Sequence, residues 1–171
     1  MNVLGRIVTV AAIAFALPVL AQDRAPQGAG ATATPPAFSG GLGLTYLVPG
    51  VTDNGGADNA GVATTFHCTN ASTITEQIQI VVRNFDGSVV ANDVTNVGSA
   101  RTLTKSTHGT ALTEDLPFLS PGVAINQGQA LIFTTSPFVF CSVMVLDAST
   151  AGTQGVALHI VRFGAVSGTQ E

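Results

Sequence analysis

The sequence predicts one all-β domain, an antiparallel β-sandwich of about eight strands with the general architecture of immunoglobulin-like folds. Charged residues make up only 9% of the 171 residues, tryptophan is absent, and β-branched and small side chains are common. Such side chains suit a pleated, half-buried surface. Short apolar or alternating runs recur between turn signals, and no run has helical periodicity. A chain of this length can bury a sizeable core as one domain.

Residues 1–21 have the pattern of a cleaved signal peptide. Arg6 supplies a positive charge, residues 7–17 are apolar or small apart from Thr9, and Pro18 precedes a cut expected after Ala21. A transmembrane anchor is the alternative, but the run is short for a span and lacks a basic flank. We therefore expect a protein exported to the periplasm, the cell surface or the medium, with no membrane span after cleavage.

The remaining chain divides into three parts by composition. Residues 22–40 are rich in Ala, Gly, Pro and Gln and have no periodicity, which predicts a flexible leader. Residues 41–164 carry the strand patterns of the β-sandwich domain. Residues 165–171 form a short polar tail.

The first half of the domain predicts four strands. Residues 42–48 are mostly apolar and end at Pro49-Gly50, and residues 62–68 follow a turn-rich loop. Residues 74–83 alternate most cleanly, which predicts one buried face and one wet face carrying Thr75, Gln77, Gln79 and Arg83. Asp86-Gly87 then predicts a tight hairpin into residues 88–92.

The second half centres on a strongly apolar pair of strands. Residues 101–105 predict a weaker strand, and residues 106–129 are irregular. Residues 130–135 and 138–146 predict a hairpin whose second strand is apolar on both faces. One of those faces forms a candidate interface between copies of the chain, with residues Phe138, Phe140, Met144 and Leu146. Residues 156–163 predict the last strand.

Two cysteines, Cys68 and Cys141, are expected to form a disulfide, because export removes the chain from a reducing compartment. Closing this long loop would stabilise the fold by roughly 4 kcal/mol. Two separate buried thiols are the alternative. An immunoglobulin-like topology can join an early strand in one sheet to a late strand in the other in this way. The sequence departs from true immunoglobulin domains, because no tryptophan lies between the cysteines.

Several short motifs resemble an uncharacterised group of small secreted bacterial β-sandwich proteins. The motifs are Phe-His-Cys-Thr-Asn at 66–70, Asn-Phe-Asp-Gly at 84–87, the late cysteine, and Leu-His-Ile-Val-Arg-Phe at 158–163. The resemblance covers the chain from about residue 41 to its end. It implies an exported single domain and assigns no chemistry.

His108, Glu114 and Asp115 are the candidate catalytic residues, because a base and two carboxylates on one irregular loop could perform acid–base chemistry. The sequence has no Gly-x-Ser-x-Gly nucleophile elbow and no expected free thiol. A secreted hydrolase centred on His108 is therefore an alternative, and we expect no enzyme activity.

Candidate metal ligands fall in two sets. His67, His108 and His159 could meet from separate strands, but none has the paired spacing typical of zinc or copper sites. Oxygen ligands for Ca²⁺ could come from Asp53, Asn54, Asp58 and Asn59, whose spacing does not match an EF-hand. Turns use the same residue types, so we expect no metal and no cofactor.

The formal charge of −4 is scattered, with no basic stripe, which argues against nucleic-acid binding. The function we expect is that of an exported, non-catalytic β-sandwich with a structural or interaction role at the cell surface or in an extracellular assembly. Its expected partners are further copies of the chain or a surface protein. The alternative is a glycan- or Ca²⁺-binding module that uses loops 51–61 and 106–129.

Overall fold

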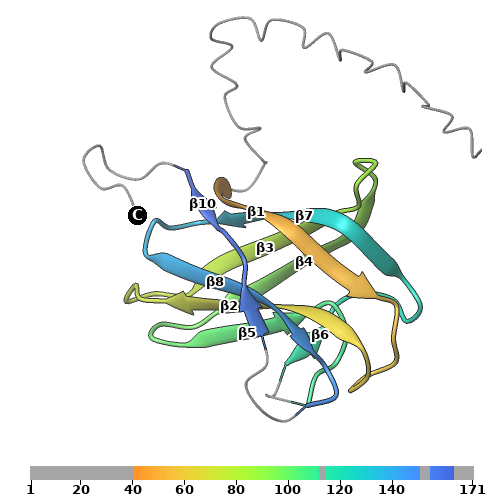
Figure 1. The fold of residues 1–171 in the computed structure, drawn as a ribbon. Helices are drawn as coiled ribbons and strands as arrows, with labels where there is room; N and C mark the ends of the chain where they lie inside the picture. Colours follow the sequence, from red (N-terminus) through yellow and green to blue (C-terminus); the bar gives the residue numbers. More distant parts are fainter. Residues whose placement is uncertain (1–40, 112–114, 151–154, 164–171) are drawn as a thin grey trace, which may run out of the picture. The chain divides into compact units, whose positions relative to one another are not determined.

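The protein forms a two-sheet β-sandwich in a computed structural model that describes residues 41–111, 115–150 and 155–163 (Figure 1). The expectations for residues 1–21, 22–40 and 165–171 lie outside the described residues. Among the residues described there is no helix, and so none that could cross a membrane. The strands are β1 (Gly43–Asn54), β2 (Val62–Asn70), β3 (Glu76–Arg83), β4 (Val89–Val97), β5 (Thr102–Ser106), β6 (Leu116–Pro117), β7 (Ala124–Thr134), β8 (Val139–Asp147), β9 (Gly155–Ala157) and β10 (Val161–Arg162).

The strands form two five-stranded sheets. The first sheet has the order β10-β1-β7-β3-β4, and the second has the order β6-β5-β2-β8-β9. All neighbouring pairs are antiparallel except β5 and β6. The predicted antiparallel β-sandwich is therefore confirmed, with ten described strands where about eight were expected.

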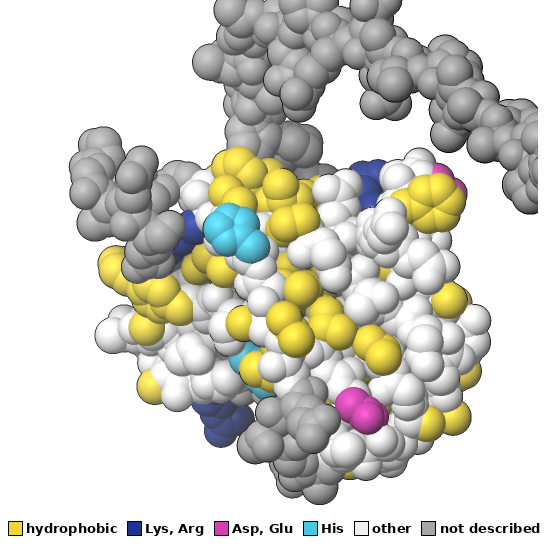
Figure 2. Space-filling model, in the orientation of Figure 1, with side chains coloured by type: hydrophobic (Ala, Val, Ile, Leu, Met, Phe, Trp, Pro, Cys, Tyr) yellow, Lys and Arg dark blue, Asp and Glu magenta, His cyan; other side chains and the backbone are white. Residues whose placement is uncertain are grey.

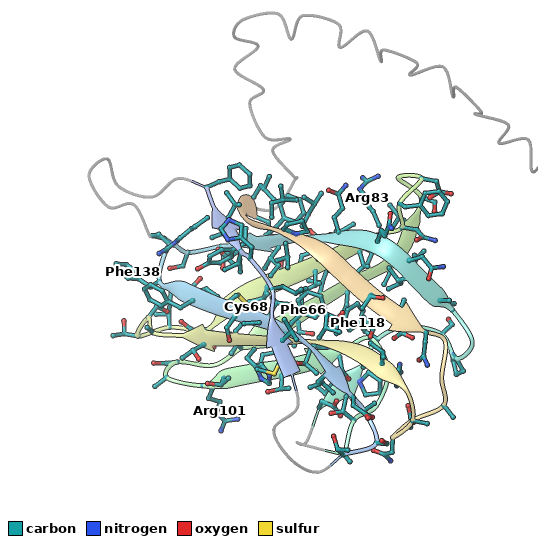
Figure 3. All side chains as sticks on the ribbon, in the orientation of Figure 1. Phe66, Cys68, Arg83, Arg101, Phe118 and Phe138 are labelled. Atoms are coloured by element: carbon teal, nitrogen blue, oxygen red, sulfur yellow. A yellow bond between two sulfur atoms is a disulfide. The ribbon has the colours of Figure 1, made fainter. Side chains whose placement is uncertain are left out.

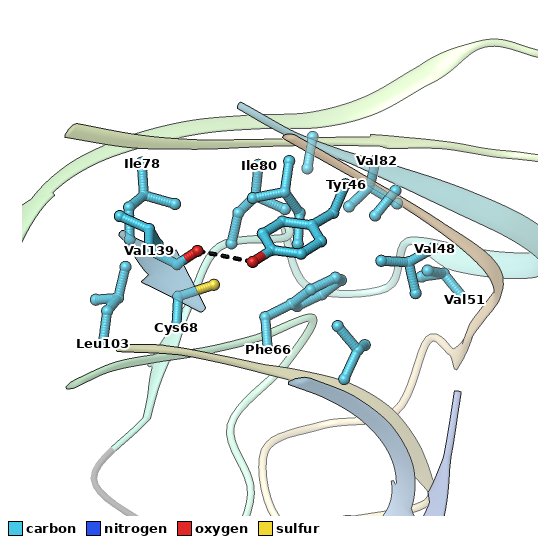
Figure 4. Close-up of a cluster of buried hydrophobic side chains, with 14 of the residues drawn as sticks. Tyr46, Val48, Val51, Phe66, Cys68, Ile78, Ile80, Val82, Leu103 and Val139 are labelled. Atoms are coloured by element: carbon cyan, nitrogen blue, oxygen red, sulfur yellow. Dashed lines mark hydrogen bonds between the residues drawn. The ribbon is translucent and has the colours of Figure 1, made fainter. Parts of the chain in front are cut away.

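The core lies between the sheets and is built by alternation along the strands. Phe66 of β2 is fully buried and meets Ile80 and Val48 of the opposite sheet in one cluster (Figure 4). Burying a side chain of this size stabilises the fold by about 2–3 kcal/mol. The hydroxyl of Tyr46 donates a 2.7 Å hydrogen bond to the carbonyl of Val139, so the core's one phenol joins the two sheets.

The predicted hairpin at 130–146 is wrong. β7 pairs with β1 and β3 in the first sheet, whereas β8 pairs with β2 and β9 in the second. The turn at residues 135–138 therefore carries the chain across the sandwich. Local apolarity cannot distinguish these two outcomes, because a strand in the centre of either sheet presents the same pattern.

The hairpin expected at Asp86-Gly87 is confirmed. β3 and β4 are antiparallel neighbours, and Gly87 has the left-handed φ of 84° that glycine adopts without steric cost. The turn is wider than two residues, because Gly87 N donates to Asn84 O and Asn84 N donates to Ser88 O, both at 2.9 Å. Hydrogen bonds from Ser88 also lower the pKa of the exposed Asp86 carboxyl.

The outward face of β3 was predicted to be solvent-exposed, but it is largely buried. Gln79 is buried, and next to it Val81 packs with Leu42 and the fully buried Phe133 in a second apolar cluster. The two faces of β3 are therefore both largely covered. The alternation of residues 74–83 indicated the inner face correctly and could not show what lies over the outer one.

The last part of the chain closes one open side of the sandwich. It runs as β9 in the second sheet, crosses over, and continues as β10 in the first sheet, where a single strand was expected. Leu158 N donates to Val143 O of the second sheet at 2.9 Å, and Phe163 N donates to Thr45 O of the first sheet at 2.8 Å. These bonds couple the edges of the two sheets.

An ion pair lies at the opposite side, between β4 and β5. Lys105 Nζ is 3.0 Å from Asp93 Oδ2, and Thr95 donates a hydrogen bond of 2.9 Å to the same oxygen. Lys105 is buried, and Asp93 lies on the inner face of the edge strand β4, toward the second sheet. An inward-pointing charge on an edge strand is a common device against edge-to-edge aggregation.

Candidate functional site

His108 lies at the centre of a hydrogen-bonded cluster in the segment after β5. Its side chain is buried, with Nδ1 2.8 Å from Asp53 Oδ2 and Nε2 3.0 Å from the carbonyl of Ala60. Asp53 is 1% exposed, and its other oxygen accepts a 2.7 Å hydrogen bond from Gly55 N. The imidazole therefore joins the end of β1 to the loop that leads into β2.

The chemistry of the partners fixes one proton on His108. A carbonyl can only accept, so Nε2 carries a proton and donates it to Ala60. A second proton lies between Nδ1 and Asp53, held by the imidazolium or by the carboxyl group. Both ring nitrogens are thus occupied by the protein itself. A catalytic base needs a nitrogen that reaches a substrate, and this histidine offers none in the structure.

The loops on either side of His108 are bonded to each other. Gly109 N donates to Asp58 Oδ1 and Asn59 N donates to Gly109 O, both at 2.8 Å. A Cβ at Gly109 would lie 2.8 Å from Cγ of Asp58, so only glycine fits this close approach. Residues 53–61 and 107–111 are therefore one interlocked unit.

Of the three candidate catalytic residues, the structure describes His108 and Asp115, and it does not pair these two. Asp115 accepts hydrogen bonds from the backbone and hydroxyl of Thr110, at 3.1 and 2.8 Å, instead of contacting His108. Glu114 lies outside the described residues. The carboxylate that does pair with His108 is Asp53, which is 55 positions away. No local signal in the sequence could have identified that pairing.

The candidate calcium ligands are used to shape the β1–β2 loop. Asn54 Oδ1 accepts hydrogen bonds from Gly56 N at 3.2 Å and Val62 N at 3.1 Å, while both oxygens of Asp53 and Oδ1 of Asp58 have the partners given above. Asn59 adopts a left-handed φ of 60°, as turn asparagines do. Within the described parts of the chain, no three His, Cys, Asp or Glu side chains are placed to hold a metal ion.

The histidines occupy separate environments. His67 lies on the outer face of β2, with Nδ1 3.1 Å from the hydroxyl of Thr104. Burial lowers the pKa of His67, and the charge of Asp115 partly offsets that effect. His159 is exposed on the segment that crosses between the sheets.

The disulfide between Cys68 and Cys141 is confirmed. The two residues face each other in the register of β2 and β8, with Cα atoms 4.1 Å apart. The bond therefore joins neighbouring strands within one sheet, whereas the immunoglobulin comparison anticipated a bond between sheets. Cys68 is fully buried against the core (Figure 3). The bond fixes the start of β8 beside the end of β2.

The four candidate interface residues separate into two environments. Leu146 is 3% exposed and packs with Ala63, and Met144 is partly buried against that pair. Phe138 and Phe140 are 58% and 46% exposed at the start of β8. Figure 3 places Phe138 at the end of the sandwich, beside the turn from β7. We call Phe138 and Phe140 the aromatic surface.

Arg162 borders the aromatic surface. Its guanidinium lies 5.0 Å from the ring centre of Phe140 and 5.6 Å from that of Tyr46, and it donates a hydrogen bond to the carbonyl of Pro137. The guanidinium therefore contacts one aromatic ring from β1 and one from β8. On the face seen in Figure 2, charged side chains are few and separate.

A hollow of about 720 Å³ lies at the same end of the sandwich. Residues 72–77, Asn96 of β4 and residues 135–138 line it. Ile74, which was expected inside a strand, lies in the loop before β3 and is exposed on the rim. Sequence reasoning missed this hollow, because its walls come from three separate stretches of polar loop and strand-end residues.

Comparisons with known proteins found one weak structural similarity and no sequence match. No protein-family model and no curated protein matches the sequence. Among solved structures, the chain is similar to one described as "Structure of PfGH50B", at 15% identity and a TM-score of 0.30. The match covers 60% of this chain and 16% of that chain. A TM-score of this size carries no argument about fold or activity.

Proposed function

We propose that the protein is exported and has a non-catalytic, structural or interaction role, at the cell surface or in an extracellular assembly. We propose further that copies of the chain associate through the aromatic surface. The observation that carries this is the exposure of Phe138 and Phe140, about half of each side chain, at the start of a strand whose other large apolar residues are buried or partly buried.

The composition of the aromatic surface supports a protein partner. Aromatic residues and arginine are enriched where proteins bind each other, and Arg162 is held against Phe140 by its contacts with Tyr46 and Pro137. Covering both phenylalanine rings would contribute about 2–4 kcal/mol to association, counted from the part of each ring that is still exposed.

Side-chain contact suits the molecule better than strand addition. Three of the four sheet edges in the described chain are formed by β6, β9 and β10, which have two or three residues each. The fourth edge, β4, is long but carries the inward-pointing Asp93. Short edges and inward charges both oppose pairing with another strand.

The state of the polar side chains supports a role without catalysis. His108 uses both ring nitrogens within the fold, and Asp53 and Asp58 accept hydrogen bonds from it or from the backbone. The disulfide is compatible with export, because such bonds persist outside the reducing cytosol.

Size-exclusion chromatography with light scattering tests the proposal. The protein is purified after expression with its own N-terminus, and mass spectrometry locates the first residue, which we expect to be Gln22. We expect a mass above that of the monomer that rises with concentration. The double variant Phe138→Ser/Phe140→Ser is expected to be monomeric. Phe85→Ser is the matched control, because Phe85 is also exposed, at 71%, but lies on the β3–β4 turn. A strict monomer at high concentration would refute self-association.

A further inference from the structure

We propose that the hollow between the β2–β3 loop and the β7–β8 turn binds a neutral saccharide. This goes beyond a role in assembly, because it gives the domain a small-molecule site of its own. The hollow is broad and open to solvent, and its volume of about 720 Å³ lies within the range of ligand-binding pockets. It is also distinct from loops 51–61 and 106–129, where ligand binding was expected from the sequence.

The walls of the hollow are preorganised. Asn70, which is fully buried, donates its amide protons to the carbonyls of Ile74 at 2.8 Å, Val97 at 2.9 Å and Gly98 at 3.2 Å. Ala71 N donates to Phe138 O at 2.9 Å, which joins the two loops that form opposite walls. A binding site whose loops are fixed in advance loses less conformational entropy when a ligand binds.

A buried carboxylate lies in the floor of the hollow. Glu76 is 5% exposed, and its Oε2 accepts a 2.6 Å hydrogen bond from the hydroxyl of Thr135. The same hydroxyl accepts a hydrogen bond of 2.9 Å from Gln77 N, so it is held in place to donate. An ionised carboxylate can accept about four hydrogen bonds. Glu76 therefore keeps capacity for donors such as the hydroxyl groups of a ligand.

The other side chains combine hydrogen-bonding groups with apolar surface. Gln77 and Asn96 present carboxamides that share one hydrogen bond, from Gln77 Nε2 to Asn96 Oδ1 at 3.4 Å, and keep further donors and acceptors for a ligand. Thr73 and Thr75 present hydroxyl groups. Ile74 and Phe138 add exposed apolar surface; Ile74 is 65% exposed. A sugar ring has the matching character, with hydroxyl groups around its edge and C–H groups on its faces.

The charges of the side chains that line the hollow favour an uncharged saccharide. The residues that line the hollow include Glu76 and no lysine, arginine or histidine. An anionic sugar, sulfate or phosphate would therefore meet a carboxylate and no cation among the lining side chains, which is unfavourable at short range. Arg162 bonds the carbonyl of the lining Pro137, but its guanidinium is already engaged with Phe140 and Tyr46. A neutral saccharide avoids that repulsion and can donate its hydroxyl protons to Glu76.

Titration of the full purified chain followed by NMR chemical shifts tests the proposal. The probes are four neutral tetrasaccharides, built from β-1,4-glucose, α-1,4-glucose, β-1,4-xylose and β-1,3-glucose, together with an oligogalacturonate and ethanolamine. We expect at least one neutral probe to shift the amide signals of residues 72–77 and 135–138, with oligogalacturonate and ethanolamine inactive. Asn96→Ala is expected to weaken that binding by about tenfold, as removal of one or two neutral hydrogen bonds does. Phe138→Ala is expected to weaken it similarly.

Phe138 belongs to both the hollow and the aromatic surface, so other variants separate the two sites. Phe85→Ala should bind the saccharide as the unmodified chain does. Phe140→Ser should abolish self-association and leave saccharide binding intact, whereas Asn96→Ala should weaken saccharide binding about tenfold and leave self-association intact. The proposal is overturned if no neutral probe shifts these signals, if only oligogalacturonate or only ethanolamine does, or if Asn96→Ala and Phe138→Ala bind like the unmodified chain.

Discussion

Replacing His108 with alanine should strongly destabilise the fold, although the histidine resembles a catalytic base in the sequence. The substitution removes the hydrogen bonds to Asp53 at 2.8 Å and to the carbonyl of Ala60 at 3.0 Å. Asp53 is 1% exposed and cannot recover water in place of its lost partner. Leaving a buried polar group without its partner costs about 1–3 kcal/mol, rising to about 3–5 kcal/mol where the group left behind is charged.

Urea denaturation followed by far-UV circular dichroism measures this cost, since the chain has no tryptophan and one tyrosine. The matched control is His159→Ala, because His159 is exposed and its loss should change stability by less than about 0.5 kcal/mol. Asp53→Asn keeps a hydrogen-bonding side chain and should cost less than His108→Ala. A double-mutant cycle should then give a coupling energy of about 1–3 kcal/mol between the two residues.

One outcome would refute this reasoning. If His108→Ala lowers the free energy of unfolding by less than about 1 kcal/mol, or no more than His159→Ala does, then the cluster does not hold the β1–β2 loop in place. In that case the short distances around His108 would be incidental to stability, and a role in chemistry would have to be reconsidered.

Three further predictions concern other polar and covalent features. Lys105→Met should cost about 1–3 kcal/mol, because it leaves the partly buried Asp93 without its cation; urea melts measure this loss. Reducing the bond between Cys68 and Cys141 should cost roughly 4 kcal/mol, seen as a lower urea midpoint in reductant. Because the folded chain lowers the pKa of His67 below 6.5, the unfolded chain takes up that proton first, and stability should fall as the pH drops below about 6.5.

Each of these has a control or a contradicting result. The control for Lys105→Met is Arg101→Met, because Arg101 is exposed and its replacement should not destabilise the protein. An unchanged midpoint in reductant would show that the disulfide adds nothing to stability. The His67→Gln variant should be as stable as the unmodified chain above about pH 6.5. Below that pH its stability should fall less than that of the unmodified chain. If the variant and the unmodified chain have parallel pH profiles, His67 is not the group responsible.

The individual strands and turns could be predicted from local patterns in the sequence, but the arrangement of the strands in two sheets could not. The alternation of Ile78, Ile80 and Val82 indicates a strand with a buried face, and Asp86-Gly87 indicates the turn that follows it, because both signals depend on neighbours along the chain. The partition of β7 and β8 into different sheets depends on pairing with β1 and β2. The sequence around residues 135–138 contains no trace of that pairing.

The candidate sites illustrate the same boundary. The disulfide could be predicted because the chain has two cysteines and one expected pairing. The partnership of His108 with Asp53 could not, because it depends on how the β1–β2 loop folds over the segment after β5. Burial of Leu146 was missed for a similar reason, since it packs with Ala63 of the neighbouring strand β2 and with Ala148 only in the folded chain.

The central claim, association of copies through the aromatic surface, is tested most directly by sedimentation velocity over a wide range of protein concentrations. The account predicts that the unmodified chain shifts from monomer to a larger species as concentration rises, and that Phe138→Ser/Phe140→Ser stays monomeric while folding normally. A single monomeric species at every concentration, or the same assembly in the double variant, would contradict it.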